Sequence, residues 1–107
     1  MYQFGSFTLD APERRLLRDG MEIPLPHRVF VTLRLLVENA GRLLTREQLL
    51  EEVWPNVIVE PGNLDSIISI LRKALGKQGT GKSFIATVPR VGYRFVGPVV
   101  TEVQNAS

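Results

Sequence analysis

Residues 76–83 carry the residue types of a nucleotide-binding loop. Their sequence, GKQGTGKS, satisfies the pattern G-x-x-x-x-G-K-[ST], in which loop amides and a lysine hold phosphate groups. A working loop of this kind follows a buried strand and opens a helix whose N-terminus faces the phosphates. Here a helical pattern precedes the loop, and the β-rich FIATV segment follows it. The order therefore predicts a polar turn between a helix and a hairpin, without nucleotide hydrolysis.

No other segment combines residues suited to catalysis. His27 is the only histidine and there is no cysteine, so neither a protein-derived metal centre nor a nucleophile–histidine pair is expected. The neighbouring Glu51 and Glu52 fit a solvated helix face better than an acid–base pair. We expect no enzyme activity, no cofactor and no small-molecule substrate.

The composition predicts one compact domain inside the cell. The chain has 107 residues and is 44% hydrophobic, enough for a single core. The lack of cysteine fits a reducing compartment, and neither a signal peptide nor a membrane-spanning run is apparent. We expect a domain over residues 1–98 and a polar tail or linker start over 99–107. The predicted location is cytoplasmic, with a tether to the inner membrane if a downstream span follows.

Positive charge is concentrated toward the C-terminal end. Residues 66–107 carry six basic and one acidic group, net +5, whereas residues 31–65 carry three basic and six acidic groups, net −3. This asymmetry favours a polyanionic partner. The PRVGYRF stretch at 89–95 lies inside the cationic segment and adds two aromatic residues to it.

The residue patterns predict strands, then three helices, then a hairpin. Residues 2–25 form short strands, with Asp19-Gly20 suited to a type I′ turn. Apolar residues recur at helical spacing over 27–40, which Gly41 is expected to cap. The second helix opens at Thr45 with a capping box. We expect Asn63 to cap the third helix.

The third helix and the hairpin could together contact double-stranded DNA. The helix side facing away from its apolar stripe is polar and partly cationic, and short side chains there suit a major groove. Its candidate contacts are Asn63, Asp65, Ser66, Ser69, Arg72 and Lys73. In the hairpin, we expect Gly92 to take a positive φ, Arg90 to reach the minor groove, and Tyr93 and Thr87 to meet phosphates. Alternation places Arg94 on the other face of its strand.

Three blocks resemble a known family: LLVENAGRLLTREQLLEEVW, NLDSIISILRKALG and SFIATVPRVGYRFV. They look like the winged-helix DNA-binding domain of OmpR-type transcription regulators, and the ending is closest to ToxR/CadC-like one-component members. The resemblance implies an α+β winged helix-turn-helix with an N-terminal antiparallel four-stranded sheet, three helices and a C-terminal β-hairpin wing. Its implied function is sequence-specific binding of double-stranded DNA to regulate transcription.

The resemblance also assigns roles to segments and residues. Residues 63–75 correspond to the recognition helix, 88–93 to the wing, and the loop at 55–62 to a contact with RNA polymerase; a dimer on DNA is compatible with this interpretation. Several positions match residues that meet the DNA backbone or a basic position beside it: Arg46, Trp54, Thr87 and Tyr93. Many members carry an arginine where this chain has Pro89, so the groove contact of the wing rests on Arg90.

A protein-interaction module is the alternative hypothesis. It would use the loop at 55–62, with apolar residues at 57–59, and an apolar flank made by Ile67 and Ile70. Ile67, Ile70 and Ala74 either pack against the wing or face a partner. Binding to random duplex DNA at low salt separates the two hypotheses.

Overall fold

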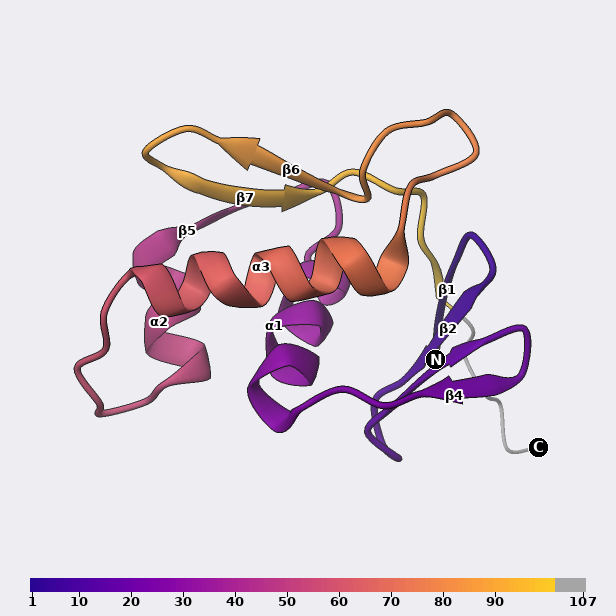
Figure 1. Cartoon of the computed structure of the whole chain (residues 1–107), viewed down its shortest axis with the longest axis horizontal. Helices are drawn as coiled ribbons and strands as arrows, with labels where there is room; N and C mark the ends of the chain where they lie inside the picture. The colour runs from indigo at the N-terminus through magenta and orange to yellow at the C-terminus, as the bar shows by residue number, and fades with distance from the viewer. Residues whose placement is uncertain (102–107) are drawn as a thin grey trace.

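The computed structural model describes residues 1–101 and has the predicted α+β order (Figure 1). Four short strands lead into three helices, and a hairpin follows the third helix. The helices are α1 (His27–Glu38), α2 (Arg46–Val53) and α3 (Gly62–Leu75). None of the helices in this part of the chain is long and apolar enough to cross a membrane.

The N-terminal sheet has five strands in the order β4-β3-β2-β1-β8. Its first four strands form the antiparallel meander predicted from the sequence, and the fifth comes from the C-terminal end. Asp19 and Gly20 both have positive φ, at 51° and 82°, as a type I′ turn requires. The strands are β1 (Tyr2–Phe4), β2 (Phe7–Asp10), β3 (Arg15–Arg18), β4 (Met21–Ile23) and β8 (Val100–Thr101).

The pairing of β8 with β1 extends the ordered sheet beyond the expected domain boundary at residue 98. Val100 is paired with Gln3, and Thr101 with Tyr2. Residues 99–101 were expected to belong to the polar tail, whereas the rest of that tail, 102–107, lies outside the described residues. The described ends of the chain thus share one sheet edge, at the opposite end of the molecule from the turn of the β6–β7 hairpin (Figure 1).

The helix ends follow the predicted signals in part. Thr45 and Gln48 form both hydrogen bonds of the capping box at the start of α2, and Gly76 ends α3 with a φ of 65°. The expected cap by Asn63 is wrong, because α3 begins one residue earlier at Gly62 and has no side-chain cap. At the end of α1 the cap is Asn39, while the amide of Gly41 instead donates to the carbonyl of Phe95.

The second sheet holds the predicted hairpin against the helices. It has the order β5-β7-β6, with β5 (Leu43–Thr45), β6 (Ile85–Val88) and β7 (Gly92–Phe95). The segment directly before α2 is therefore a strand that pairs with β7. In Figure 1 this sheet lies along α3, whereas the N-terminal sheet lies at the other end of the molecule.

One core joins both sheets to the helices. The predicted apolar stripe of α3 is buried along its length, with Leu64, Ile68, Leu71 and Leu75 all at most 2% exposed. Phe4 and Phe7 from the first sheet pack against Phe84 and Phe95 beside the second, with ring centroids 5.1 to 6.0 Å apart for the pairs between the two sides. Burial of aromatic rings at this junction fixes the hairpin segment relative to the N-terminal sheet.

Gly92 is needed for close strand packing rather than for a positive φ. The predicted positive φ is wrong at this position, and Arg90 in the turn adopts it instead, at 67°. A Cβ at Gly92 would lie 1.9 Å from the carbonyl oxygen of Leu44. No side chain fits at that distance, so only glycine lets β7 approach β5.

We predict that Gly92→Ala destabilises the domain by about 1–3 kcal/mol, because the added methyl group must displace the backbone of β5. Gly79→Ala is the matched control: a Cβ there meets nothing within 4 Å, so its effect should stay within about 0.5 kcal/mol. Urea unfolding followed by circular dichroism measures both. Equal stability of the two variants would contradict the packing role of Gly92.

Candidate nucleic-acid interface

The polar side of α3 and the hairpin form one continuous candidate surface. Five of the six helix residues predicted for DNA contact are exposed: Asn63, Asp65, Ser66, Ser69 and Lys73. The sixth, Arg72, is half-buried. The apolar stripe on the opposite side of α3 is buried against the rest of the domain, so the helix can present only this polar side to a partner.

Arg72 connects α3 to β6. Its Nη2 donates to the hydroxyl oxygen of Thr87 at 2.7 Å and to the carbonyl oxygen of Ile85 at 3.0 Å. Two residues predicted as separate DNA contacts are thus bonded to each other in the free domain. The pair fixes the edge strand of the hairpin against the last turns of α3.

A second connection joins the start of α2, the first turn of α3 and β7. Arg46 forms a two-pronged ion pair with Asp65, with Nη1–Oδ1 at 2.7 Å and Nη2–Oδ2 at 3.2 Å. The hydroxyl of Tyr93 donates to the same Oδ1 of Asp65. Arg46 also donates to the Tyr93 hydroxyl oxygen at 3.3 Å and to the carbonyl oxygen of Pro61 at 3.3 Å. We call Arg46, Asp65 and Tyr93 the carboxylate junction.

The charges within the carboxylate junction stabilise one another. Hydrogen bonds from Arg46, and then from Tyr93, lower the pKa of Asp65. Asp65 in turn raises the pKa of Arg46. Burial raises the pKa of Tyr93, and its hydrogen bond to Asp65 raises it further. The tyrosine therefore stays protonated, and it keeps donating to the carboxylate.

The turn of the hairpin projects a single arginine. Arg90 is exposed, next to Pro89, and the amide of Arg46 donates to the carbonyl of Val91 at 2.9 Å. This bond ties the turn to the start of α2. The positive φ of Arg90 is uncommon for a residue with a side chain, and it marks the position where the chain reverses.

Arg94 lies on the face of the sheet that points away from α3. Its register partners are Leu43 and Ala86, whereas the neighbouring Tyr93 is paired with Leu44 and Thr87 on the helix side. The alternation predicted from the sequence therefore separates Arg94 from the carboxylate junction and from Arg72. Any contact by Arg94 needs a partner that extends around the hairpin.

Trp54 occupies the C-terminal cap position of α2 and is 7% exposed. Its ring is in contact with an arginine from another helix. The guanidinium carbon of Arg28 lies 5.7 Å from the centre of the Trp54 ring. Sequence reasoning placed no role on Arg28. Arg28 lies in the first turn of α1, far from Trp54 along the chain, so no local sequence pattern predicts their contact.

The apolar flank expected on α3 is divided between core and surface. Ile67 is only 7% exposed and belongs to the core, whereas Ile70 is 43% exposed. The hypothesis of an interaction surface made by both Ile67 and Ile70 is therefore wrong. In the loop at 55–62, Val57 and Ile58 are exposed, and Val59 packs partly against the core.

We predict that Asp65→Asn removes a pH-dependent part of the stability. Because the folded-state pKa of Asp65 is lowered, its charge stabilises the fold above the unfolded pKa of about 3.9. That contribution disappears as the pH falls through the lower folded value. The variant should lose up to about 1 kcal/mol at pH 7, as for an exposed ion pair, and this deficit should shrink below about pH 4.

Urea unfolding between about pH 2.5 and 7 measures this difference. Glu22→Gln, at an exposed position of β4, is the control and should change stability by less than about 0.5 kcal/mol. If Asp65→Asn lowers the free energy of unfolding equally at both ends of the pH range, the charge of Asp65 is not the source of the lost stability.

Known proteins match both the sequence and the fold. The family described as "Transcriptional regulatory protein, C terminal" matches residues 20–95. The transcriptional activator CadC of Escherichia coli is 30% identical over 97 residues, which are 90% of this chain and 19% of CadC. The regulatory protein KdpE of Mycobacterium tuberculosis is 33% identical over 91 residues, covering 84% of this chain and 40% of KdpE. The chain thus spans less than half of these relatives.

Solved structures agree with the sequence matches. The DNA-binding domain of E. coli CadC superimposes with a TM-score of 0.80 at 29% identity, covering 92% of this chain and 94% of that domain. The Klebsiella pneumoniae RstA DNA-binding domain, solved in complex with the RstA box, gives a TM-score of 0.73 at 32% identity, covering 88% and 94%. The α+β fold is a winged helix, and this chain belongs to the family of C-terminal domains of transcriptional regulatory proteins.

Proposed function

We propose that this domain binds double-stranded DNA in a sequence-specific manner to regulate transcription. The single observation that supports this most directly is the continuous surface of α3 and the hairpin, where exposed polar and cationic side chains share one face. The RstA structure, with DNA bound to the same fold, supports the same interpretation. Binding requires neither a catalytic step nor a cofactor.

In this proposal α3, corresponding to the predicted recognition helix 63–75, enters the major groove. Asn63, Ser66 and Ser69 are short and exposed, so they can approach base edges or phosphates. Lys73 adds a cation near the end of the helix. Arg72 already bridges to Thr87, so it reaches DNA with its guanidinium oriented by the wing.

The wing at residues 88–93 would lie along the minor groove and the phosphate backbone. Arg90 is the exposed cation at its turn, suited to the negative potential of a narrow groove. Arg46, whose side chain is 25% exposed, would meet a phosphate from within the carboxylate junction, and the buried Tyr93 would hold Arg46 and Asp65 in position. Asp65 then acts on DNA through Arg46, since its own negative charge opposes a phosphate contact.

The loop at 55–62 is the proposed contact with RNA polymerase. Ile58 is fully exposed and Val57 is 55% exposed, and Figure 1 shows the loop between α2 and α3 on the opposite side of α3 from the β6–β7 hairpin. A partner can therefore bind this loop while DNA occupies α3. We further propose that the domain acts in the cytoplasm, where a second copy can bind beside it on DNA.

We predict that Arg90→Ala and Arg72→Ala each weaken DNA binding by about 1–3 kcal/mol. Where the lost contact was to a phosphate, the slope of log binding constant against log salt concentration should become shallower by about 0.9. Fluorescence anisotropy with mixed-sequence duplex DNA at two salt concentrations measures both. Arg18→Ala in β3, distant from α3, is the control for net charge. Unchanged affinity of folded Arg90→Ala and Arg72→Ala at low salt would refute the assigned surface.

We predict that Ile58→Ser separates activation from DNA binding. DNA affinity should stay within about twofold, whereas activation of a reporter gene by the regulator carrying this domain should fall about fivefold, as for loss of an apolar anchor. Met21→Ser, which changes an apolar side chain 73% exposed on β4, is the matched control. Full activation by Ile58→Ser would remove the loop from the proposed contact.

A further inference from the structure

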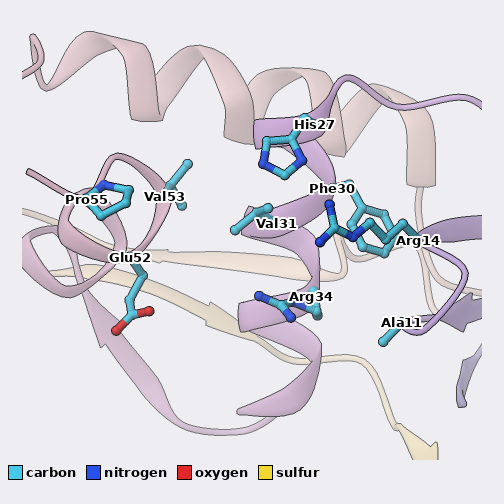
Figure 2. A pocket seen from close by; sticks show the side chains of 9 residues that line it. All are labelled: Ala11, Arg14, His27, Phe30, Val31, Arg34, Glu52, Val53 and Pro55. Atoms are coloured by element: carbon cyan, nitrogen blue, oxygen red, sulfur yellow. The ribbon is translucent and has the colours of Figure 1, made fainter. Parts of the chain in front are cut away.

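A hollow of about 250 Å³ lies on the side of the domain where the β2–β3 turn, α1 and the end of α2 meet. Figure 2 shows side chains from all three segments around it. Its residues include none of those proposed to touch DNA. The hollow is also separate from the loop surface at Val57 and Ile58.

Three nitrogen-bearing side chains line this hollow. They are Arg14, His27 and Arg34. His27 and Arg34 share one face of α1 with Val31, which lies between them at four- and three-residue spacing. Arg14 comes from the β2–β3 turn and adopts a positive φ of 54°. Among residues 1–101, the side chains of Arg14 and His27 have no hydrogen bond or ion pair within the domain, whereas the adjacent Arg15 is paired with Asp10 at 3.2 Å.

Arg34 has an unsatisfied donor. Its Nε is buried and has no hydrogen-bond partner. Glu38 places Oε1 at 3.8 Å from that nitrogen, within ion-pair range but too far for a hydrogen bond. That atom itself is out of reach of a ligand, but the Arg34 side chain as a whole is 41% exposed, and Figure 2 shows its guanidinium end at the hollow.

The rest of the wall is apolar except at one point. Phe30, Val31, Val53 and Pro55 supply hydrocarbon surface, and Glu52 lies across the hollow from Arg14 in Figure 2. This negative charge disfavours a ligand with several negative charges. A ligand with one negative charge and an apolar body matches both the arginines and the hydrocarbon wall.

We propose that this hollow is a binding site for a small organic monocarboxylate. The carboxylate accepts hydrogen bonds from the guanidinium groups of Arg34 and Arg14, a pairing that planar arginine donors favour. The apolar body of the ligand packs on Phe30 and Val31. None of the residues that line the hollow is proposed to contact DNA, so a ligand can bind there whether or not DNA is bound.

Benzoate is a suitable probe, with the neutral benzamide as its isosteric control. Titration of the 15N-labelled domain at constant ionic strength should give saturable amide shifts at the start of α1 and the β2–β3 turn with benzoate, and far weaker ones with benzamide. Arg34→Gln should weaken benzoate binding by about tenfold or more, the effect of losing a hydrogen bond to a charged group.

Three variants complete the test. Arg14→Gln should also weaken benzoate binding and serves if Arg34→Gln fails to fold. Glu38→Gln should preserve or strengthen binding, because it removes the competing acid. Arg42 is an exposed arginine outside the hollow, and Arg42→Gln should bind benzoate within about twofold of the unaltered domain.

Three results would overturn the proposal. They are equal binding of benzamide and benzoate, no saturable shifts up to about 50 mM benzoate, and equal losses of benzoate affinity in Arg42→Gln and Arg34→Gln.

Discussion

The carboxylate of Asp65 lies where three segments of the candidate DNA-binding surface meet. One oxygen accepts from both Arg46 and Tyr93, and the second accepts from Arg46. The start of α2, the first turn of α3 and the wing strand β7 therefore share one acceptor group. At the other end of α3, Arg72 joins the helix to Thr87 and the Ile85 carbonyl. Helix and wing are thus connected at two points, and their relative position is set before any partner arrives, which lowers the ordering cost of binding.

Much of the architecture could be predicted from the sequence because its signals are local. The Thr45 capping box, the Asp19-Gly20 turn and the apolar stripe ending at Leu75 each depend on residues within a few positions of one another. The polar side of α3 follows from the same periodicity, since burying one stripe exposes the other. The order of strands, helices and hairpin needed little more than these patterns.

The parts that were missed depend on contacts between distant segments. Arg46 and Asp65 are separated by 19 positions, and Arg46 and Tyr93 by 47, so no local pattern shows that they meet. The same holds for Gly92, whose small size is required by the Leu44 carbonyl of another strand. For Ile67 the sequence left burial and exposure both open, because its burial depends on packing beyond the helix itself. The cap expected at Asn63 failed for a local reason, since the helix starts at Gly62.

The pairing of β8 with β1 has a practical consequence for how the domain can be handled. Both described ends of the chain emerge from the N-terminal sheet, at the far end of the molecule from the wing turn (Figure 1). A fluorescent protein, an affinity tag or a sensor-chip anchor joined through a spacer at either end would therefore leave α3 and the wing unobstructed. Attachment at the C-terminal end also places the load on an edge strand of two residues, so a pulling force applied there would open the β8–β1 pair before it reached the helices.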